Sequence, residues 1–345
     1  MIKLRALVGS DDSYDLHLGP LHRIIVGLSS VDLQMQIELD PSRINDRDLF
    51  GMTPLMWAAR RDNHTYLSIL LSQGSQIGLR DSEGGTALHH AVGAGSLECV
   101  NTLLNAGADP NNADNIGVTP LHDVGPLITH PNIKNLVTLL HGHGANLEAR
   151  DDNGMTPMSF ATGFGSLEAV AALVECGADV NAFDCQSSPI GRAIFRGHAN
   201  IVQFLAQCGI MSSWGPIHFG PENILESAAF HGTVEVMDTL SNSAAPPVEC
   251  DVAKLKYWFN TFRNCFFGVR CSAEEELAAF HRLLDRKAIP LSHASGQEPD
   301  SPVGTDHALE DSDGCDNDEQ DDDFEDAMEN LSFFDEAVPS LVPPL

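Results

Sequence analysis

The sequence predicts an all-α fold, a solenoid of stacked helix-turn-helix units, because one short pattern recurs at a nearly fixed spacing. A hydroxyl residue returns after 33, 33, 37 and 32 residues, at Thr53, Thr86, Thr119, Thr156 and Ser188. A glycine follows 21 residues after four of these five positions, at Gly74, Gly107, Gly177 and Gly209. Repeats that share this spacing between the hydroxyl residue and the glycine indicate units that must stack, since one unit alone cannot bury its apolar face.

The clearest unit runs from residue 84 to residue 116. Thr86 can cap its first helix, because the hydroxyl accepts from unpaired backbone N–H groups at a helix start. Ser96 can open the second helix, whose apolar side chains share one face: Leu97, Val100, Leu103 and Leu104. Gly107 then takes the position after that helix, where a positive φ costs glycine least.

These units resemble the ankyrin repeat, which has a period of about 33 residues and a T-P-L-H-x-A signature. The matching segments are Thr53-Pro54-Leu55, Thr86-Ala87-Leu88-His89, Thr119-Pro120-Leu121-His122 and Thr156-Pro157-Met158. The resemblance covers roughly residues 19–245 and implies short β-hairpin loops between the units. A long array followed by an acidic tail also resembles ankyrin arrays of filamentous fungi.

Several units depart from the pattern. Residues 19–22 predict a degenerate first unit, with helices over 20–27 and 31–39, and a last degenerate unit starts near Asn223. The unit at Thr119 holds a four-residue insertion with Pro126 and Pro131, so its first helix should stop near Val124. The insertion is either a tolerated surface loop or an added contact at one end of the binding groove.

The chain divides into four expected segments. Residues 1–18 are unassigned, and residues 19–245 form the array of about five clear repeats with degenerate terminal units. Residues 246–293 are aromatic-rich and should form a C-terminal helical cap on the last repeat, although a separate docking element is the alternative. Residues 294–345 contain 17 Asp and Glu without Lys or Arg, which predicts a disordered acidic tail.

Charge and composition limit the partners. The formal net charge is −30, and such a surface repels phosphate backbones, so we expect no nucleic-acid partner. No stretch reaches the length of a membrane span or a signal sequence, so we expect no membrane partner. The eight cysteines include no CxxC pair, which is typical of a reducing compartment. We therefore expect an intracellular protein, cytoplasmic or nuclear, that is a monomer.

Motifs for catalysis and cofactor binding are missing from the sequence. It contains no Walker P-loop, no G-x-S-x-G and no H-E-x-x-H, so we expect neither an enzyme nor a bound cofactor. His130, His141 and His143 are the main candidate metal ligands, but a zinc site needs about four converging ligands. A metalloprotein or enzyme is therefore the least favoured of three functions.

The first function is a protein-binding scaffold or adaptor. The resemblance implies that a partner binds the concave side, at the hairpin tips and along the first helices. Carried over by position, the tip residues are Phe50, Met52, Ile116, Val118 and Met155. The first-helix residues are Trp57, Arg61, His90, Phe160, Phe164, Arg192 and Arg196. Large apolar residues and arginine favour interface hot spots, although Trp57 and Phe160 equally suit packing between units.

The second function is a transcriptional or chromatin-type regulator that acts through the acidic tail. Four apolar tail residues recur at i, i+4, i+7 and i+10: Phe324, Met328, Leu331 and Phe334. This spacing predicts one apolar stripe on a helix that forms only when a partner groove covers it. The arginines of the array's own groove could supply that site, or the tail could remain solvated.

Overall fold

The computed structural model describes residues 18–184, 187–208, 224–243, 248–265 and 273–290. All of these residues belong to one compact unit that spans residues 1–292. The expected acidic tail lies outside the described residues, and with it the four apolar tail residues Phe324, Met328, Leu331 and Phe334. The fold described below is that of the first unit.

Helices in pairs make up most of the described chain, which confirms the all-α prediction. The first helices of the pairs are α2 (Pro20–Ile25), α4 (Pro54–Arg60), α6 (Ala87–Gly93), α9 (Pro157–Phe164), α11 (Pro189–Phe195), α13 (Ile224–His231) and α15 (Val252–Cys265). The second helices are α3 (Leu33–Leu39), α5 (His64–Ser72), α7 (Leu97–Asn105), α8 (Ile133–Gly142), α10 (Leu167–Cys176), α12 (Ala199–Gln207), α14 (Val234–Asn242) and α16 (Ala273–Lys287). Two 3₁₀ turns, η1 (Pro41–Asn45) and η2 (His122–Val124), and a short parallel pair of strands, β1 (Val248–Cys250) and β2 (Ala288–Pro290), complete these elements.

The predicted caps explain where the helices begin and end. The hydroxyl groups of Thr53, Thr156 and Ser188 each accept from the backbone N–H three residues on, at 3.4, 3.2 and 3.2 Å. At the other end of the repeat, Gly74, Gly107 and Gly177 follow the second helix with φ of 88°, 93° and 94°. A residue with a Cβ adopts a positive φ only at a cost in free energy. Glycine is therefore favoured where the chain leaves each helix pair.

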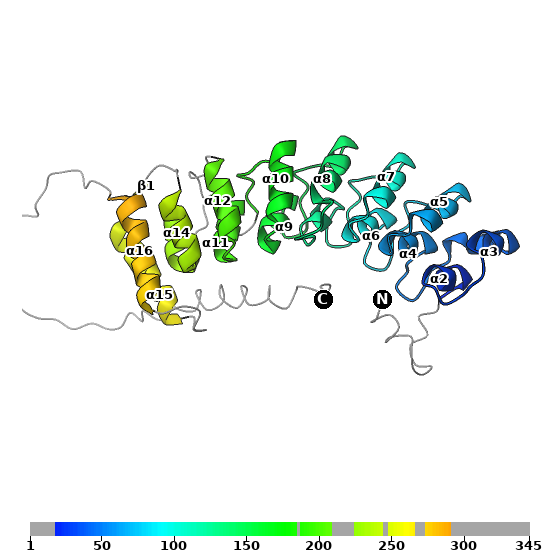
Figure 1. Ribbon diagram of the computed structural model, residues 1–345, viewed down its shortest axis with the longest axis horizontal. Coiled ribbons are helices and arrows are strands. Elements are labelled where there is room, and N and C mark those ends of the chain that lie inside the picture. The colour runs from blue at the N-terminus through cyan, green and yellow to red at the C-terminus, as the bar shows by residue number, and fades with distance from the viewer. Residues whose placement is uncertain (1–17, 185–186, 209–223, 244–247, 266–272, 291–345) are drawn as a thin grey trace, which may run out of the picture. The chain divides into compact units, whose positions relative to one another are not determined.

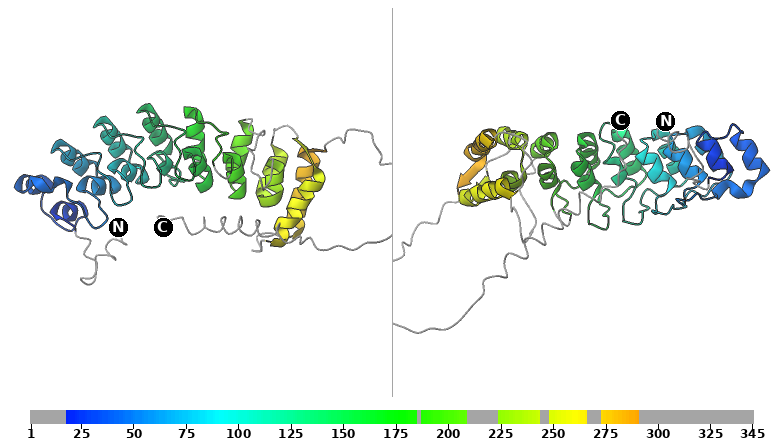
Figure 2. Two further views of the ribbon diagram at one scale, coloured as in Figure 1. Left: turned by 180° about the vertical axis from the view of Figure 1, so that it is seen from behind. Right: turned by 90° about the horizontal axis from the view of Figure 1, so that it is seen from below.

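First helices stack on first helices and second helices on second helices (Figures 1 and 2). Their facing residues form one continuous apolar core, in which Val100 and Leu103 of α7 and Leu136 of α8 are fully buried. At the C-terminal end of this row, α15 packs on α13 and α16 on α14. The rings of Phe259 and Phe280 stack there with centroids 4.2 Å apart, as expected of a helical pair that covers the last repeat.

The unit that begins at Thr119 has no α-helix in the first position. Its chain makes only the 3₁₀ turn η2, which ends at Val124, and Pro126 follows two residues later. A proline there removes a backbone donor and clashes with a preceding turn, so the helix cannot continue. The predicted stop near Val124 is therefore confirmed, and the second helix of this unit, α8, begins at Ile133.

Loops between the units are tight turns with hairpin geometry. In four of them the backbone N–H of an aspartate donates to the carbonyl four residues on, for example Asp81 to Gly85 at 2.9 Å and Asp114 to Val118 at 2.8 Å. A glycine with positive φ stands at each tip, for example Gly84 at 86°. No residue of these described loops is in a regular strand, so the β-hairpins implied by the resemblance are present as turns.

Histidines of the T-P-L-H segments join each unit to the next. Nε2 of His22, His89 and His122 donates to a backbone carbonyl of the following hairpin, over 3.0–3.1 Å. Nδ1 of His89 and His122 accepts from the N–H of Thr86 and Thr119. Burial lowers the pKa of all three imidazoles, so each stays neutral at pH 7, and the His89 and His122 rings both donate and accept. The Nε2 bonds cross the unit boundary, and the Nδ1 bonds to Thr86 and Thr119 lie within one repeat.

Candidate functional site

The candidate site is the side of the array formed by the first helices and the hairpin loops, called here the first-helix face. Each first helix carries an equivalent residue four positions after its cap, which we call the variable position. In the five clear repeats it is occupied by Trp57, His90, Asp123, Phe160 and Arg192. Four of these were candidates from the sequence, and Asp123 was not.

An aspartate holds each hairpin of this face. It stands four or five residues before the cap, at Asp48, Asp81, Asp114, Asp151 and Asp184. One carboxylate oxygen accepts from backbone N–H groups of the tip, as Asp114 Oδ1 does from Ile116 and Val118 at 2.9 Å each. Such bonds fix the loop backbone. Sequence reasoning missed these aspartates, although their constant offset from the threonines was a readable signal.

The second oxygen of three hairpin aspartates binds the side chain at the variable position. Trp57 Nε1 donates to Asp48 Oδ2 at 2.8 Å, and His90 Nε2 lies 2.8 Å from Asp81 Oδ2. Arg192 donates through Nη2 and Nε to Asp184 Oδ2, at 2.6 and 3.2 Å. A donor at the variable position therefore ties the first helix to its own hairpin.

Four residues predicted to contact a partner have buried side chains: Met52, Trp57, Val118 and Arg192. The Trp57 and Arg192 side chains are directed to their hairpin aspartates, while Met52 and Val118 lie at the base of the hairpins, where their carbonyls accept from His22 and His89. The remaining residues stay accessible. Phe50, Arg61, Ile116 and Arg196 are exposed, and His90, Met155, Phe160 and Phe164 are partly buried.

Asp123 departs from this arrangement, because it brings a second carboxyl group to the variable position instead of a donor. In the part of the chain that the structure describes, no hydrogen-bond donor or cation contacts its side chain. Burial and the neighbouring Asp114 carboxylate raise the pKa of Asp123 to about 8. Desolvation and the charge of Asp114 both disfavour the ionised form of Asp123, so Asp123 destabilises the folded state at neutral pH.

The substitution Asp123→Asn should therefore stabilise the fold by about 1–3 kcal/mol at pH 7. Because the pKa is raised in the folded state, the cost of Asp123 is absent below its unfolded pKa and grows as pH rises towards 8. The stabilisation should accordingly increase from pH 4 to pH 8 in urea titrations of both proteins. A stability difference that stays constant with pH, or a less stable variant, would contradict this account.

Aromatic side chains form a second feature of the face. The rings of His122 and Phe160 meet edge to face at 4.9 Å, and Phe160 and Phe164 lie 6.2 Å apart. Phe195, which sequence reasoning missed, is exposed, with the Arg196 guanidinium 5.7 Å from its ring centre. Its place three residues after the variable position, on the same side of α11, was the available signal.

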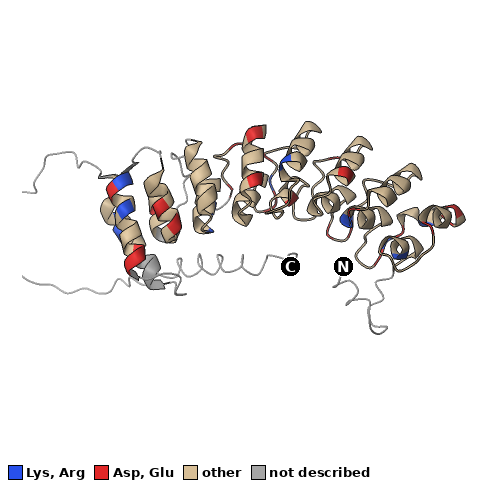
Figure 3. Ribbon diagram, in the orientation of Figure 1, with Lys and Arg blue, Asp and Glu red and all other residues tan. Residues whose placement is uncertain are grey.

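Charges on the helices are sparse along this face (Figure 3). Each first helix of the five clear repeats holds at most one Asp, Glu, Lys or Arg, and the 3₁₀ turn η2 holds Asp123. Acidic residues are instead carried by second helices such as α7, α10 and α14. Asp123 is thus an acidic group in a largely uncharged row.

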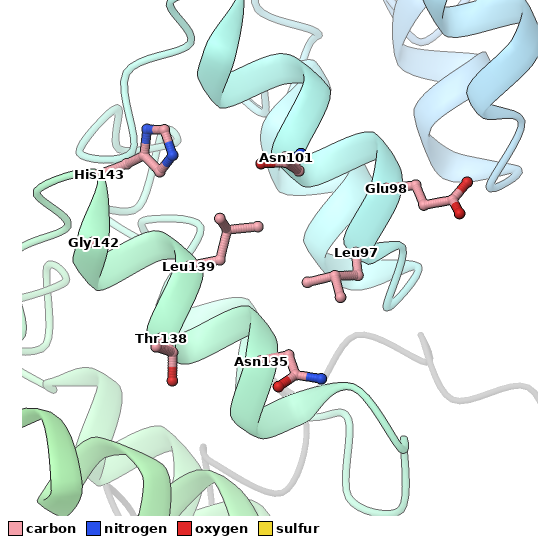
Figure 4. Close-up of a pocket in the computed structure, with 8 residues that line it drawn as sticks. All are labelled: Leu97, Glu98, Asn101, Asn135, Thr138, Leu139, Gly142 and His143. Carbon is pink, nitrogen blue, oxygen red and sulfur yellow. The ribbon is translucent and has the colours of Figure 1, made fainter.

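On the other side of the array, an open depression of about 650 Å³ separates α7 from α8. Leu97 and Leu139 project into it from the two helices, and the Glu98 carboxylate is directed away towards α5 (Figure 4). The side chains that line this depression do not bring polar groups together as a catalytic or cofactor pocket does.

The predicted metal ligands do not come together. Within the described ranges, no three His, Cys, Asp or Glu side chains lie close enough to hold a metal ion. The His130 ring instead covers Gly95, so closely that a Cβ on Gly95 would overlap it. None of the described helices is long and apolar enough to cross a membrane.

Comparison with known proteins decides the family. A sequence profile described as "Ankyrin repeats (3 copies)" matches residues 26–114 and 128–213, about half of the chain. The chain belongs to the ankyrin-repeat family. Its ankyrin array is thereby established as the fold that the T-P-L-H segments predicted.

Known ankyrin proteins resemble this chain over parts of their length. The B-cell lymphoma 3 protein homolog of Mus musculus is 28% identical over 63% of this chain and 47% of its own length. Neurogenic locus notch homolog protein 2 of Homo sapiens is 33% identical over 44% of this chain and 7% of its own. The probable 26S proteasome regulatory subunit p28 of Saccharomyces cerevisiae is 28% identical over 54% of this chain and 84% of its own. The chain thus spans less than half of the first two relatives.

Ankyrin arrays are generally binding modules without catalytic chemistry, and these relatives indicate a role in protein–protein interaction.

Proposed function

We propose that this ankyrin array is a scaffold or adaptor that binds a partner protein on the first-helix face. The supporting observation is that two hairpin tips present large apolar side chains to solvent, Phe50 at 51% exposure and Ile116 at 57%. Large apolar side chains that remain exposed on the surface of a folded protein are typical of interaction sites. The accessible aromatic pair Phe160 and Phe164 extends the same surface.

The hairpins hold these apolar side chains in a fixed position. The carbonyl of Phe50 accepts from the N–H of Ser82 in the next hairpin, and the carbonyl of Ile116 from that of Asp152, both at 2.9 Å. Together with the bonds to Asp48 and Asp114, these contacts order each tip before a partner arrives. A preorganised anchor loses less conformational entropy on binding, which favours affinity.

Replacing both tips, Phe50→Ser with Ile116→Ser, should weaken partner binding about tenfold or more. The matched control is Met35→Ser with Leu39→Ser, which removes two exposed apolar side chains from the second helix α3. Partners that copurify with the full chain would be quantified by mass spectrometry, with melting curves of all three proteins. Unchanged recovery with the tip variant, or equal loss with the control, would refute the proposed surface.

The free thiols support an intracellular site of action. Among the described residues, Cys99, Cys176 and Cys208 are free thiols, and Cys99 is buried as a small apolar residue. Free cysteines persist in reducing compartments, which we propose as the setting of this protein.

A further inference from the structure

We propose that Asp123 receives a lysine or arginine side chain of the partner, so that the middle of the first-helix face selects a basic segment. The inference rests on the proposed function and specifies the chemistry of its partner. Its basis is the donor that Asp48, Asp81 and Asp184 receive from the variable position and that Asp114 does not receive. The variable position supplies Trp57 Nε1, His90 Nε2 or the Arg192 guanidinium in three repeats, and a carboxyl group in the repeat at Thr119.

The described helices that pack against η2 supply no free lysine or arginine for Asp123. The helices α6 and α9, which pack against η2, contain neither Lys nor Arg. The third neighbour, α8, contains Lys134, whose ammonium group lies 2.7 Å from the Glu175 carboxylate. His122, next to Asp123, is already bonded to Thr119 and Met155. In the part of the chain that the structure describes, the helices packed against η2 therefore hold no lysine or arginine that is available to Asp123, and we assign that role to the partner.

The variable position of the next repeat also favours a lysine or arginine side chain as the ligand. Phe160 stands there, partly exposed, and Phe164 lies one helical turn on, with its ring centre 6.2 Å away. An ammonium or guanidinium group gains from a carboxylate on one side and an aromatic ring on the other. The strongly negative net charge of −30 also draws a basic segment towards the array.

The chain's own acidic tail does not fit this position. Residues 294–345 contain no Lys or Arg, so docking there would add negative charge beside Asp123. One of the three arginines expected to hold the tail, Arg192, is buried on Asp184. A basic partner segment is therefore favoured over self-docking at the middle of the face.

A selection from a display library of random short peptides against the immobilised full chain tests the proposal. Binders of the unaltered chain should carry Lys or Arg at one fixed position, and binders of the Asp123→Asn chain should lose it. The control is Glu168→Gln, which removes an equal charge from an exposed site on α10 and should keep the preference. Binders without a fixed cation, or rich in acidic residues as the tail is, would overturn the proposal.

A double-mutant cycle with one selected peptide locates the contact. Changing the fixed Lys or Arg of the peptide to Gln should weaken binding about tenfold or more on the unaltered chain. On the Asp123→Asn chain the same change should have less than about a twofold effect. Equal losses on both chains would overturn the assignment to Asp123. If the tip variant loses its partners while the cycle shows no coupling, the proposed function stands and this inference fails.

Discussion

The substitution Leu103→Asp should unfold the middle of the array. Leu103 lies in α7 with 0% of its side chain exposed, between the core residues of the helices on either side. A carboxylate there would have no partner and would lose the burial of an entire leucine, so we expect a loss of more than about 4 kcal/mol. Because each unit is stable only against its neighbours, the damage should spread beyond one repeat. Circular dichroism and urea unfolding would measure it.

The matched control is Asn101→Asp on the same helix, two residues before Leu103. Asn101 is exposed, so the new carboxylate stays in water and stability should change by less than about 0.5 kcal/mol. Similar unfolding curves for Leu103→Asp and the unaltered chain would mean that the helical register of α7 is wrong.

Replacing Arg192 by methionine should destabilise the array by about 3–5 kcal/mol, although arginine is normally a surface residue. Its side chain is 9% exposed and that of Asp184 is 0% exposed, and Nη2 lies 2.6 Å from Oδ2. The variant removes the guanidinium from a buried ion pair, and removing one partner of such a pair costs far more than the pair contributes. Differential scanning calorimetry at pH 7 would record the loss.

Two further variants separate the ion pair from simple packing. Arg196→Met, four residues on and exposed, removes the same groups and should change stability little. Adding Asp184→Asn to Arg192→Met should recover part of the lost stability, because the unbalanced charge is then gone. If the double variant is no more stable than Arg192→Met alone, the lost stability does not come from the uncompensated carboxylate.

The sequence predicted the features that all repeats share, and it did not predict the side-chain contacts that differ between repeats. The spacing of Thr53, Thr86 and Thr156 located helix starts correctly, because a capping hydroxyl acts through the local backbone alone. Pro126 likewise marked the end of η2 by local sterics. These features depend on neighbours in the sequence, which a reader of the sequence can see.

Contacts of single side chains could not be read in this way. Trp57 and Arg192 were assigned to a partner surface by their position in the resembled repeat, and packing between units was an equal alternative for Trp57. Each is instead directed to a hairpin aspartate eight or nine residues earlier, a pairing set by the turn between them. Asp123 was not among the candidates, and its environment depends on burial and on Asp114, nine residues earlier. Burial therefore distinguishes the buried candidates, such as Trp57 and Arg192, from the exposed ones.

The bonds that join the units raise the question of how each unit finds its proper neighbour. Arg47 donates to the carbonyl of Arg80, Arg80 to that of Ala113, and Arg150 to that of Phe183. A backbone carbonyl is the same in every unit, so these bonds alone would permit a stack misaligned by one repeat. Unequal packing excludes that error. Gly125 lies so close to α9 that an added Cβ would be 3.1 Å from the backbone of Phe160 and Ala161, and the preceding repeat has Val92 at the equivalent place. In a stack misaligned by one repeat, α9 would overlap with that valine. The shortened repeat therefore determines which repeat packs next to which.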